Sequence, residues 1–113
     1  MNSLALDGTN LQDQDVHQRG VRIFAEWLTS PLWTAGGVSL DEITAELRTE
    51  FDRWNDEWML LADEVEDDDW DTDSRVIAWN GNGYELARRL RAELGPSVEI
   101  EYFDYVSGEN VNI

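Results

Sequence analysis

The densest group of chemically active side chains lies at residues 63–73, where eight of eleven residues are acidic. Carboxylates are the ligands that Ca²⁺ prefers, and Asp69, Asp71 and Asp73 have the 1-3-5 spacing of an EF-hand loop. The sixth position of such a loop should be glycine but is Ser74, and the twelfth should be glutamate but is Asn80. The run therefore predicts a solvated acidic loop that binds divalent cations only weakly, and we expect no metal site and no cofactor.

Other catalytic elements are scarce. The chain has no cysteine and one histidine, His17, which excludes thiol chemistry and disfavours a Ser–His–acid triad. Carboxylate pairs are so abundant that finding one carries no information, because a catalytic pair also needs a cleft that separates the two pKa values. The segment Gly81-Asn82-Gly83 is too short for a phosphate-binding glycine loop. We expect that the protein is not an enzyme.

Charge and composition narrow the class of partner. The chain of 113 residues has twenty-five acidic and eight basic residues, all of the latter arginine, so its net charge is -17. A hydrophobic content of 42% indicates a folded domain with a polyanionic exterior rather than a disordered acidic tail. Such a surface repels nucleic acid and anionic lipid and attracts basic proteins. With no apolar run long enough to span a bilayer and no visible secretory signal, a cytoplasmic location is expected.

The six tryptophans divide into two groups. Trp54, Trp58 and Trp79 lie on helical periodicities and are predicted to pack in the core. The other three lie outside those periodicities, and tryptophan is enriched at the hot spots of protein interfaces. The predicted partner-binding residues are Asp67, Asp68, Asp69, Trp70, Asp71, Asp73, Trp33 and Trp27. The alternative for Trp70 is that its ring folds back beneath the helices while the aspartates are only solvated.

Two helices and three strands must position these residues. Residues 1–18 are predicted to form a flexible N-terminal arm and residues 19–113 a single domain. A strand is expected at Val21–Leu28, followed by a loop that contains Leu32, Trp33 and the Gly36-Gly37 pair. Ser39 and Glu42 have the spacing of a capping box, and the apolar stripe behind them predicts a helix of about six turns. The stripe runs from Leu40 to Val65.

The acidic run then forces a turn, because its self-repulsion opposes helix continuation. A second helix is predicted from about Arg75 to Leu94, interrupted at Gly81-Asn82-Gly83 and ended by Gly95-Pro96. Strands are expected at Val98–Phe103 and at Val111–Ile113. The order β-α-α-β-β predicts an α+β domain in which a helical hairpin packs on a small antiparallel sheet.

Three stretches resemble a set of small, acidic, mostly uncharacterised proteins of actinobacterial type. They are Ser30–Trp33, Phe51–Asp56 and Gly83–Pro96. Some members of that set are similar to immunity proteins of polymorphic toxins. The resemblance implies an α+β binding protein and supplies no catalytic residues.

The leading hypothesis is a binding protein that neutralises a basic partner, most simply the substrate groove of a nuclease-like toxin. A nucleic-acid mimic of phage type, which blocks a host defence complex, has the same surface chemistry. A small carboxylate-based or metal-dependent hydrolase and a structural subunit are the alternatives from other classes. In each binding hypothesis the partner is a basic protein, and no direct contact with nucleic acid or membrane is expected.

Overall fold

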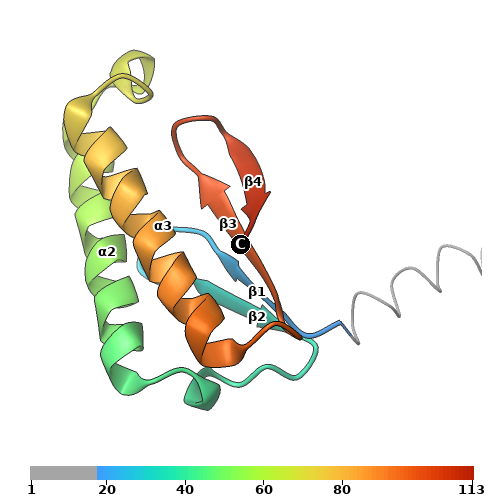
Figure 1. Cartoon of the computed structure of the whole chain (residues 1–113). Helices are drawn as coiled ribbons and strands as arrows, with labels where there is room; N and C mark the ends of the chain where they lie inside the picture. The colour runs from blue at the N-terminus through green and yellow to red at the C-terminus, as the bar shows by residue number, and fades with distance from the viewer. Residues whose placement is uncertain (1–17) are drawn as a thin grey trace, which may run out of the picture.

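A computed structural model describes residues 18–113, so all of the predicted N-terminal arm except Gln18 lies outside the described residues. The fold is α+β, as predicted: two long helices pack on one face of a four-stranded sheet (Figure 1). In chain order the elements are β1 (Gly20–Ile23), β2 (Leu32–Ala35), the 3-10 helix η1 (Leu40–Glu42), α2 (Ala45–Glu64), the 3-10 helix η2 (Asp67–Asp69), α3 (Ser74–Leu94), β3 (Glu99–Asp104) and β4 (Glu109–Asn112).

The sheet is mixed rather than antiparallel, with strand order β2-β1-β3-β4. Strands β1 and β2 pair antiparallel, as do β3 and β4, but the central pair β1–β3 is parallel. The reason is an added reversal: β2 returns the chain to the end at which β1 starts, and the helical hairpin brings it back to that same end. Strand β3 therefore begins beside the start of β1 and runs with it.

Strand β2 is the element that the sequence analysis placed in a loop. It has only four residues and lies between Pro31 and Gly36, both of which are typical of loops. The ladder with β1 begins at the Phe24 amide, which donates to the Pro31 carbonyl at 2.9 Å. Gly36 has φ 67°, and a Cβ there would lie 2.0 Å from the Gln18 carbonyl oxygen. The predicted first strand is correspondingly shorter and ends at Ile23.

The first long helix begins later than predicted. The capping box at Ser39 is present, but it closes only the 3-10 turn η1, because Ile43 is extended and turns its side chain into the core. Helix α2 starts at Ala45 under a second cap, in which the Thr44 hydroxyl accepts a hydrogen bond from the Leu47 amide at 3.2 Å. Two caps in succession thus divide one apolar stripe between two elements.

Helix α3 is continuous from Ser74 to Leu94, so the predicted interruption at Gly81-Asn82-Gly83 is wrong. Gly83 is buried where α3 crosses β3, and a Cβ there would lie 2.2 Å from the Tyr102 hydroxyl. This glycine is needed for close approach of helix and sheet rather than for a break. The predicted C-cap is confirmed, with Gly95 at φ 81°.

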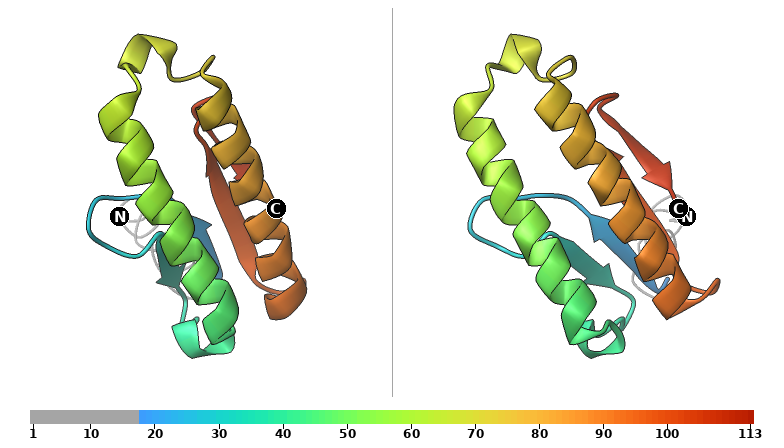
Figure 2. Two further views of the ribbon diagram at one scale, coloured as in Figure 1. Left: turned by 90° about the vertical axis from the view of Figure 1, so that its left-hand side faces the viewer. Right: turned by 60° about the vertical axis from the view of Figure 1, so that its left-hand side comes forward.

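The core lies between the helical hairpin and the sheet, the two layers whose arrangement Figure 2 shows. At its centre the rings of Trp54 and Trp79 stack at 4.5 Å between centroids with 7° between planes. Each indole N–H donates to the other residue's backbone carbonyl, at 3.1 and 2.8 Å. The core positions predicted for Trp54 and Trp79 are confirmed, and Trp58 is half-buried against the same cluster.

The β3–β4 turn is tied to α3 through the Asp104 carboxylate. One carboxylate oxygen accepts from the Tyr84 hydroxyl at 2.5 Å, and the other accepts from the Asn80 side-chain amide at 3.1 Å. The latter oxygen also accepts from the backbone amides of Val106 and Ser107, at 2.8 and 2.9 Å. Although partial burial opposes ionisation, these four hydrogen bonds together hold the pKa of Asp104 below its usual value.

This network predicts a pH-dependent contribution to stability. Because the folded-state pKa of Asp104 is lowered, its stabilisation is complete above about pH 4, the ordinary aspartate pKa. It is lost as the pH falls through the lower folded-state value. Replacing Asp104 with asparagine should cost about 1–2 kcal/mol at pH 7. The difference between the unfolding midpoints of parent and variant in urea should then shrink below pH 4. A constant difference down to pH 2 would contradict the assignment.

Candidate functional site

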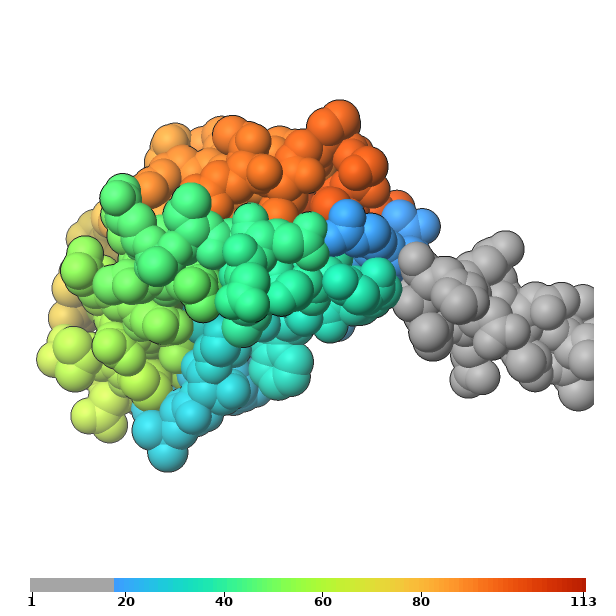
Figure 3. Space-filling view, turned by 90° about the horizontal axis from the view of Figure 1, so that it is seen from below, coloured from blue at the N-terminus to red at the C-terminus, as the bar shows by residue number. Residues whose placement is uncertain are grey.

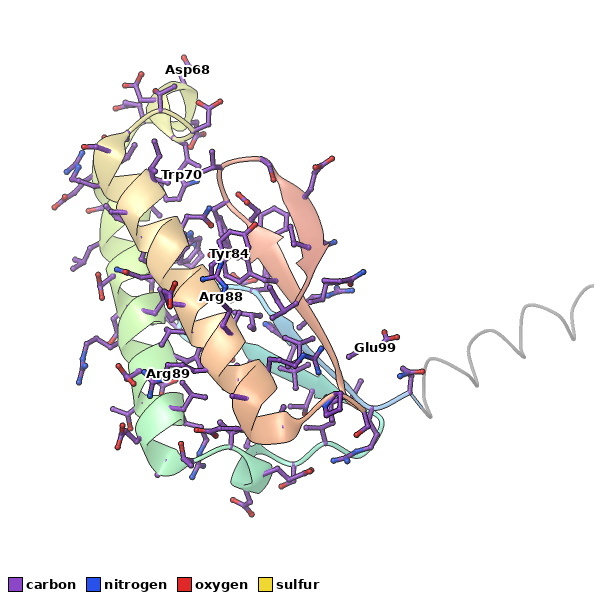
Figure 4. The ribbon with its side chains drawn as sticks, viewed as in Figure 1. Asp68, Trp70, Tyr84, Arg88, Arg89 and Glu99 are labelled. Atoms are coloured by element: carbon purple, nitrogen blue, oxygen red, sulfur yellow. The ribbon has the colours of Figure 1, made fainter. Side chains whose placement is uncertain are left out.

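The acidic turn, residues 63–73, joins α2 to α3 at one end of the helical hairpin. Figure 4 shows Asp68 at the outer tip of this turn with its side chain directed away from the molecule. Asp67, Asp69 and Asp71 are exposed with it. The short helix η2 places three of these carboxylates within one turn of backbone, so four exposed site residues predicted from the sequence lie within five positions of the chain.

One arginine neutralises part of the turn. Arg75 contacts Asp73 at 3.1 Å and Glu64 at 3.2 Å. Its hydrogen bonds hold the pKa of the Asp73 carboxyl below the usual range, and the Asp73 side chain caps α3 by accepting from the Arg75 amide at 2.8 Å. Asp73 is therefore engaged in helix capping. Within residues 18–113, the turn's remaining acidic side chains form no ion pair: Asp63, Glu66, Asp67, Asp68, Asp69 and Asp71.

Trp70 takes an intermediate position between the two alternatives of the sequence analysis. It is half-buried and packs against the core, with its ring 6.4 Å from Trp79 and 6.5 Å from Tyr105 between centroids. In Figure 4 it lies below Asp68, close to the start of α3. The ring therefore supports the turn from beneath and presents only part of its surface beside the carboxylates.

The calcium-like spacing of Asp69, Asp71 and Asp73 does not form a cluster of ligands. Asp73 is turned toward Arg75 and the start of α3. No group of three or more His, Cys, Asp or Glu side chains in residues 18–113 is arranged to hold a metal ion. In the same part of the chain, no helix is both long and apolar enough to cross a membrane.

Trp27 lies in the β1–β2 loop and Trp33 lies in β2, so neither belongs to the acidic turn. Trp33 is 47% exposed on the sheet face that the helices leave uncovered, and its indole N–H donates to the Phe24 carbonyl at 3.2 Å. Trp27 is 52% exposed in the loop and packs edge-on against Trp58 of α2, 5.0 Å between centroids. Both rings are thus fixed by a protein contact while half of their surface is free.

The uncovered sheet face forms a shallow hollow of about 810 Å³. The strand register aligns Trp33, Arg22 and Glu101 in one row across it, and Arg22 donates to the Glu101 carboxylate at 2.9 Å. Phe24 and Phe103 lie in the next row with their rings edge to face at 5.2 Å. This face is a mixed apolar and charged surface of the kind found at protein interfaces.

Two further residues of this region, Leu28 and Asn55, were not predicted from the sequence. Leu28 of the β1–β2 loop is 91% exposed and has φ 58°, the left-handed region that leucine rarely adopts. Asn55 of α2 is buried and binds the loop through three hydrogen bonds to Glu26 and Thr29. Nothing in the sequence around Leu28 predicts its conformation. Asn55 is a polar residue directly after Trp54 of the apolar stripe, and that position is the one sequence feature that indicates a buried polar contact.

Residues 18–113 define a small α+β protein with a dense acidic turn and a hydrogen-bonded loop that exposes Trp27 and Leu28, features suited to binding another protein. Comparison with protein families agrees: the model described as Serratia CdiI immunity protein-like matches residues 19–105, well over half of the chain. The chain belongs to this family. The predicted similarity to toxin immunity proteins is confirmed, while the actinobacterial type remains a prediction. No curated protein matches the chain.

Proposed function

We propose that this chain is an immunity protein that binds and neutralises a contact-dependent inhibition toxin in the cytoplasm. The family match supports the immunity role. The acidic turn supports the mode of binding, because six of its carboxylates form no ion pair with residues 18–113 and are held on a short, structured connection. The proposal is a non-enzymatic one: neutralisation by occupying a surface of the toxin.

We further propose that the toxin surface is basic, as in the substrate groove of a nuclease. A nuclease must attract a polyanion, so its groove carries positive charge that a cluster of aspartates can match. The net charge of -17 also attracts a basic toxin at long range, which should raise the association rate. The same chemistry underlies the nucleic-acid-mimic alternative, but the family match favours a toxin.

The test needs the toxin that this chain neutralises, which is sought first among the products of the genes next to this chain's gene. Changing Asp67, Asp68 and Asp69 together to asparagine should slow association by about tenfold at low salt and flatten its salt dependence, since steering by exposed charge acts on the on-rate. Stopped-flow fluorescence measures both quantities. These side chains are exposed and make no described hydrogen bond, so the variant should melt no lower than the parent.

A matched control changes the net charge by the same amount elsewhere. Asp41, Glu99 and Glu109 are exposed and form no described ion pair, and they become Asn, Gln and Gln. The control should slow association far less than the turn variant. Equal slowing by both would show that total charge, not the acidic turn, guides the toxin. A parent chain that neither binds the toxin nor suppresses its nuclease activity would overturn the proposed function itself.

A further inference from the structure

In the β1–β2 loop, the most exposed apolar side chain belongs to Leu28, whose backbone also has an unfavourable conformation. Leu28 is 91% exposed, so its side chain contributes nothing to the core. Its φ of 58° costs free energy that glycine or asparagine would avoid. A strained backbone persists where the surrounding structure holds it, and such positions gather at binding sites. Leu28 at this place is therefore a cost to folding that a binding role explains.

Asn55 holds the loop in this conformation from inside the protein. Its side-chain amide donates to the carbonyls of Glu26 and Thr29, at 2.8 and 3.2 Å, and its oxygen accepts from the Glu26 amide at 2.9 Å. The residue is 3% exposed, so these hydrogen bonds are shielded from water. The space-filling view shows the loop, coloured cyan, projecting from the surface (Figure 3). We call the side chains of Trp27 and Leu28 the apolar tip of the loop. Because buried hydrogen bonds hold the loop in place, the tip is pre-organised for docking.

Aromatic contacts connect this tip to the acidic turn. Trp27 contacts Trp58 at 5.0 Å between centroids, Trp58 contacts Tyr105 at 6.3 Å, and Tyr105 contacts Trp70 at 6.5 Å. Three short steps thus separate the loop from the turn. A standard interface covers about 800 Å² of each partner, which is wide enough to include both.

The surroundings of the tip are acidic. Asn55 places the loop against α2, where the exposed residues next to Asn55 include Asp52 and Asp56, with one arginine, Arg53, between them. Glu26, directly before Trp27, adds a third carboxylate, which accepts from the Trp27 amide at 2.9 Å. A partner that covers this tip must therefore offer an apolar recess with positive charge at its border.

We propose that Trp27 and Leu28 insert into an apolar pocket, bordered by basic groups, on the same toxin that the acidic turn contacts, and that Asn55 is the residue that positions them. This inference rests on the proposed function and adds a second half to its interface. The acidic turn governs association and the apolar tip governs dissociation. The two halves are therefore separable by kinetics.

The decisive variant is Leu28→Gly, measured with the same toxin by surface plasmon resonance. Glycine adopts φ 58° without strain, so the variant should melt at the same temperature as the parent or higher. Dissociation should nevertheless become at least about tenfold faster, and Trp27→Ala should do the same, while association changes little. Leu40→Ala is the control: Leu40 is also an exposed leucine, but lies on η1 at the opposite end of the molecule from the acidic turn (Figure 1).

Asn55→Ala tests the positioning role with a readout that needs no toxin. Hydrogen exchange at the Glu26 amide, which now donates to Asn55, should become faster while exchange in the β1–β3 ladder is retained. Toxin dissociation should accelerate, and adding Leu28→Gly to Asn55→Ala should accelerate it by less than the product of the two single effects.

The outcomes separate the two proposals. Toxin binding by the parent together with unchanged dissociation of Leu28→Gly and Trp27→Ala would overturn the apolar tip but leave the proposed function intact. Absence of toxin binding by the parent would overturn both. A parent that sediments as a dimer, and becomes monomeric on Leu28→Gly, would assign the tip to self-association and also overturn the inference.

Discussion

Replacing Trp79 with alanine should lower the free energy of unfolding by about 3–5 kcal/mol, the range for truncating a buried large aromatic residue. The ring is 2% exposed and stacks on Trp54, and it also contacts Trp70 of the acidic turn and Tyr105 at the end of β3. Its removal empties the point at which both helices, the turn and the sheet meet. The substitution also removes the indole N–H of Trp79, which donates to the Trp54 carbonyl at 2.8 Å.

Urea unfolding followed by far-UV circular dichroism measures this loss. Trp79→Phe keeps most of the ring but removes the donor, so it should cost less than the alanine variant. The reciprocal hydrogen bonds also predict that Trp54→Phe and Trp79→Phe are not additive, with a coupling energy of about 0.5–3 kcal/mol. Additive effects of the two changes would show that the pair does not act as a unit.

Two glycines in the same helix should respond in opposite directions to alanine. Gly83→Ala should destabilise the protein by about 1–3 kcal/mol, the usual cost of overpacking, because the new Cβ would lie 2.2 Å from the Tyr102 hydroxyl. Gly81 is exposed, and a Cβ added there would meet no atom within 4 Å, so Gly81→Ala should stabilise by about 0.5–1 kcal/mol. Thermal unfolding of both variants measures the contrast.

The Tyr102 hydroxyl makes the Gly83 result specific. It donates to the Asn80 side-chain oxygen at 2.7 Å, a contact that Gly83→Ala should displace. Tyr102→Phe removes the hydroxyl oxygen but keeps the ring carbons, which would lie 2.7 and 2.8 Å from the new Cβ, so adding it to Gly83→Ala should recover little of the lost stability. If Gly83→Ala is as stable as the parent, α3 and β3 do not pack as closely as the structure shows.

The sequence by itself determined the elements whose signal is local. The stripe through Phe51, Trp54 and Trp58 repeats with the helical period, so it identifies α2 whatever the helix packs against. Gly95 ends α3 because the left-handed backbone there suits glycine, and the acidic run interrupts the helices through its own repulsion. Charge and composition also located the acidic turn, since a run of like charges depends on no distant residue.

Only the tertiary structure decided which distant segments meet. The four residues of β2 are too few for a periodic signal, and their strand state comes from pairing with β1; that pairing in turn makes β1 and β3 parallel. Gly83 resembles a helix break in the sequence because nothing local reveals the Tyr102 hydroxyl beside it. Leu28 and Asn55 lie far apart in the sequence, and their relation exists only through the hydrogen bonds that hold the loop on α2. The order of residues in a short segment can specify a local charge or a period. Contacts between distant residues arise only when the packed chain satisfies buried polar groups and fills its core.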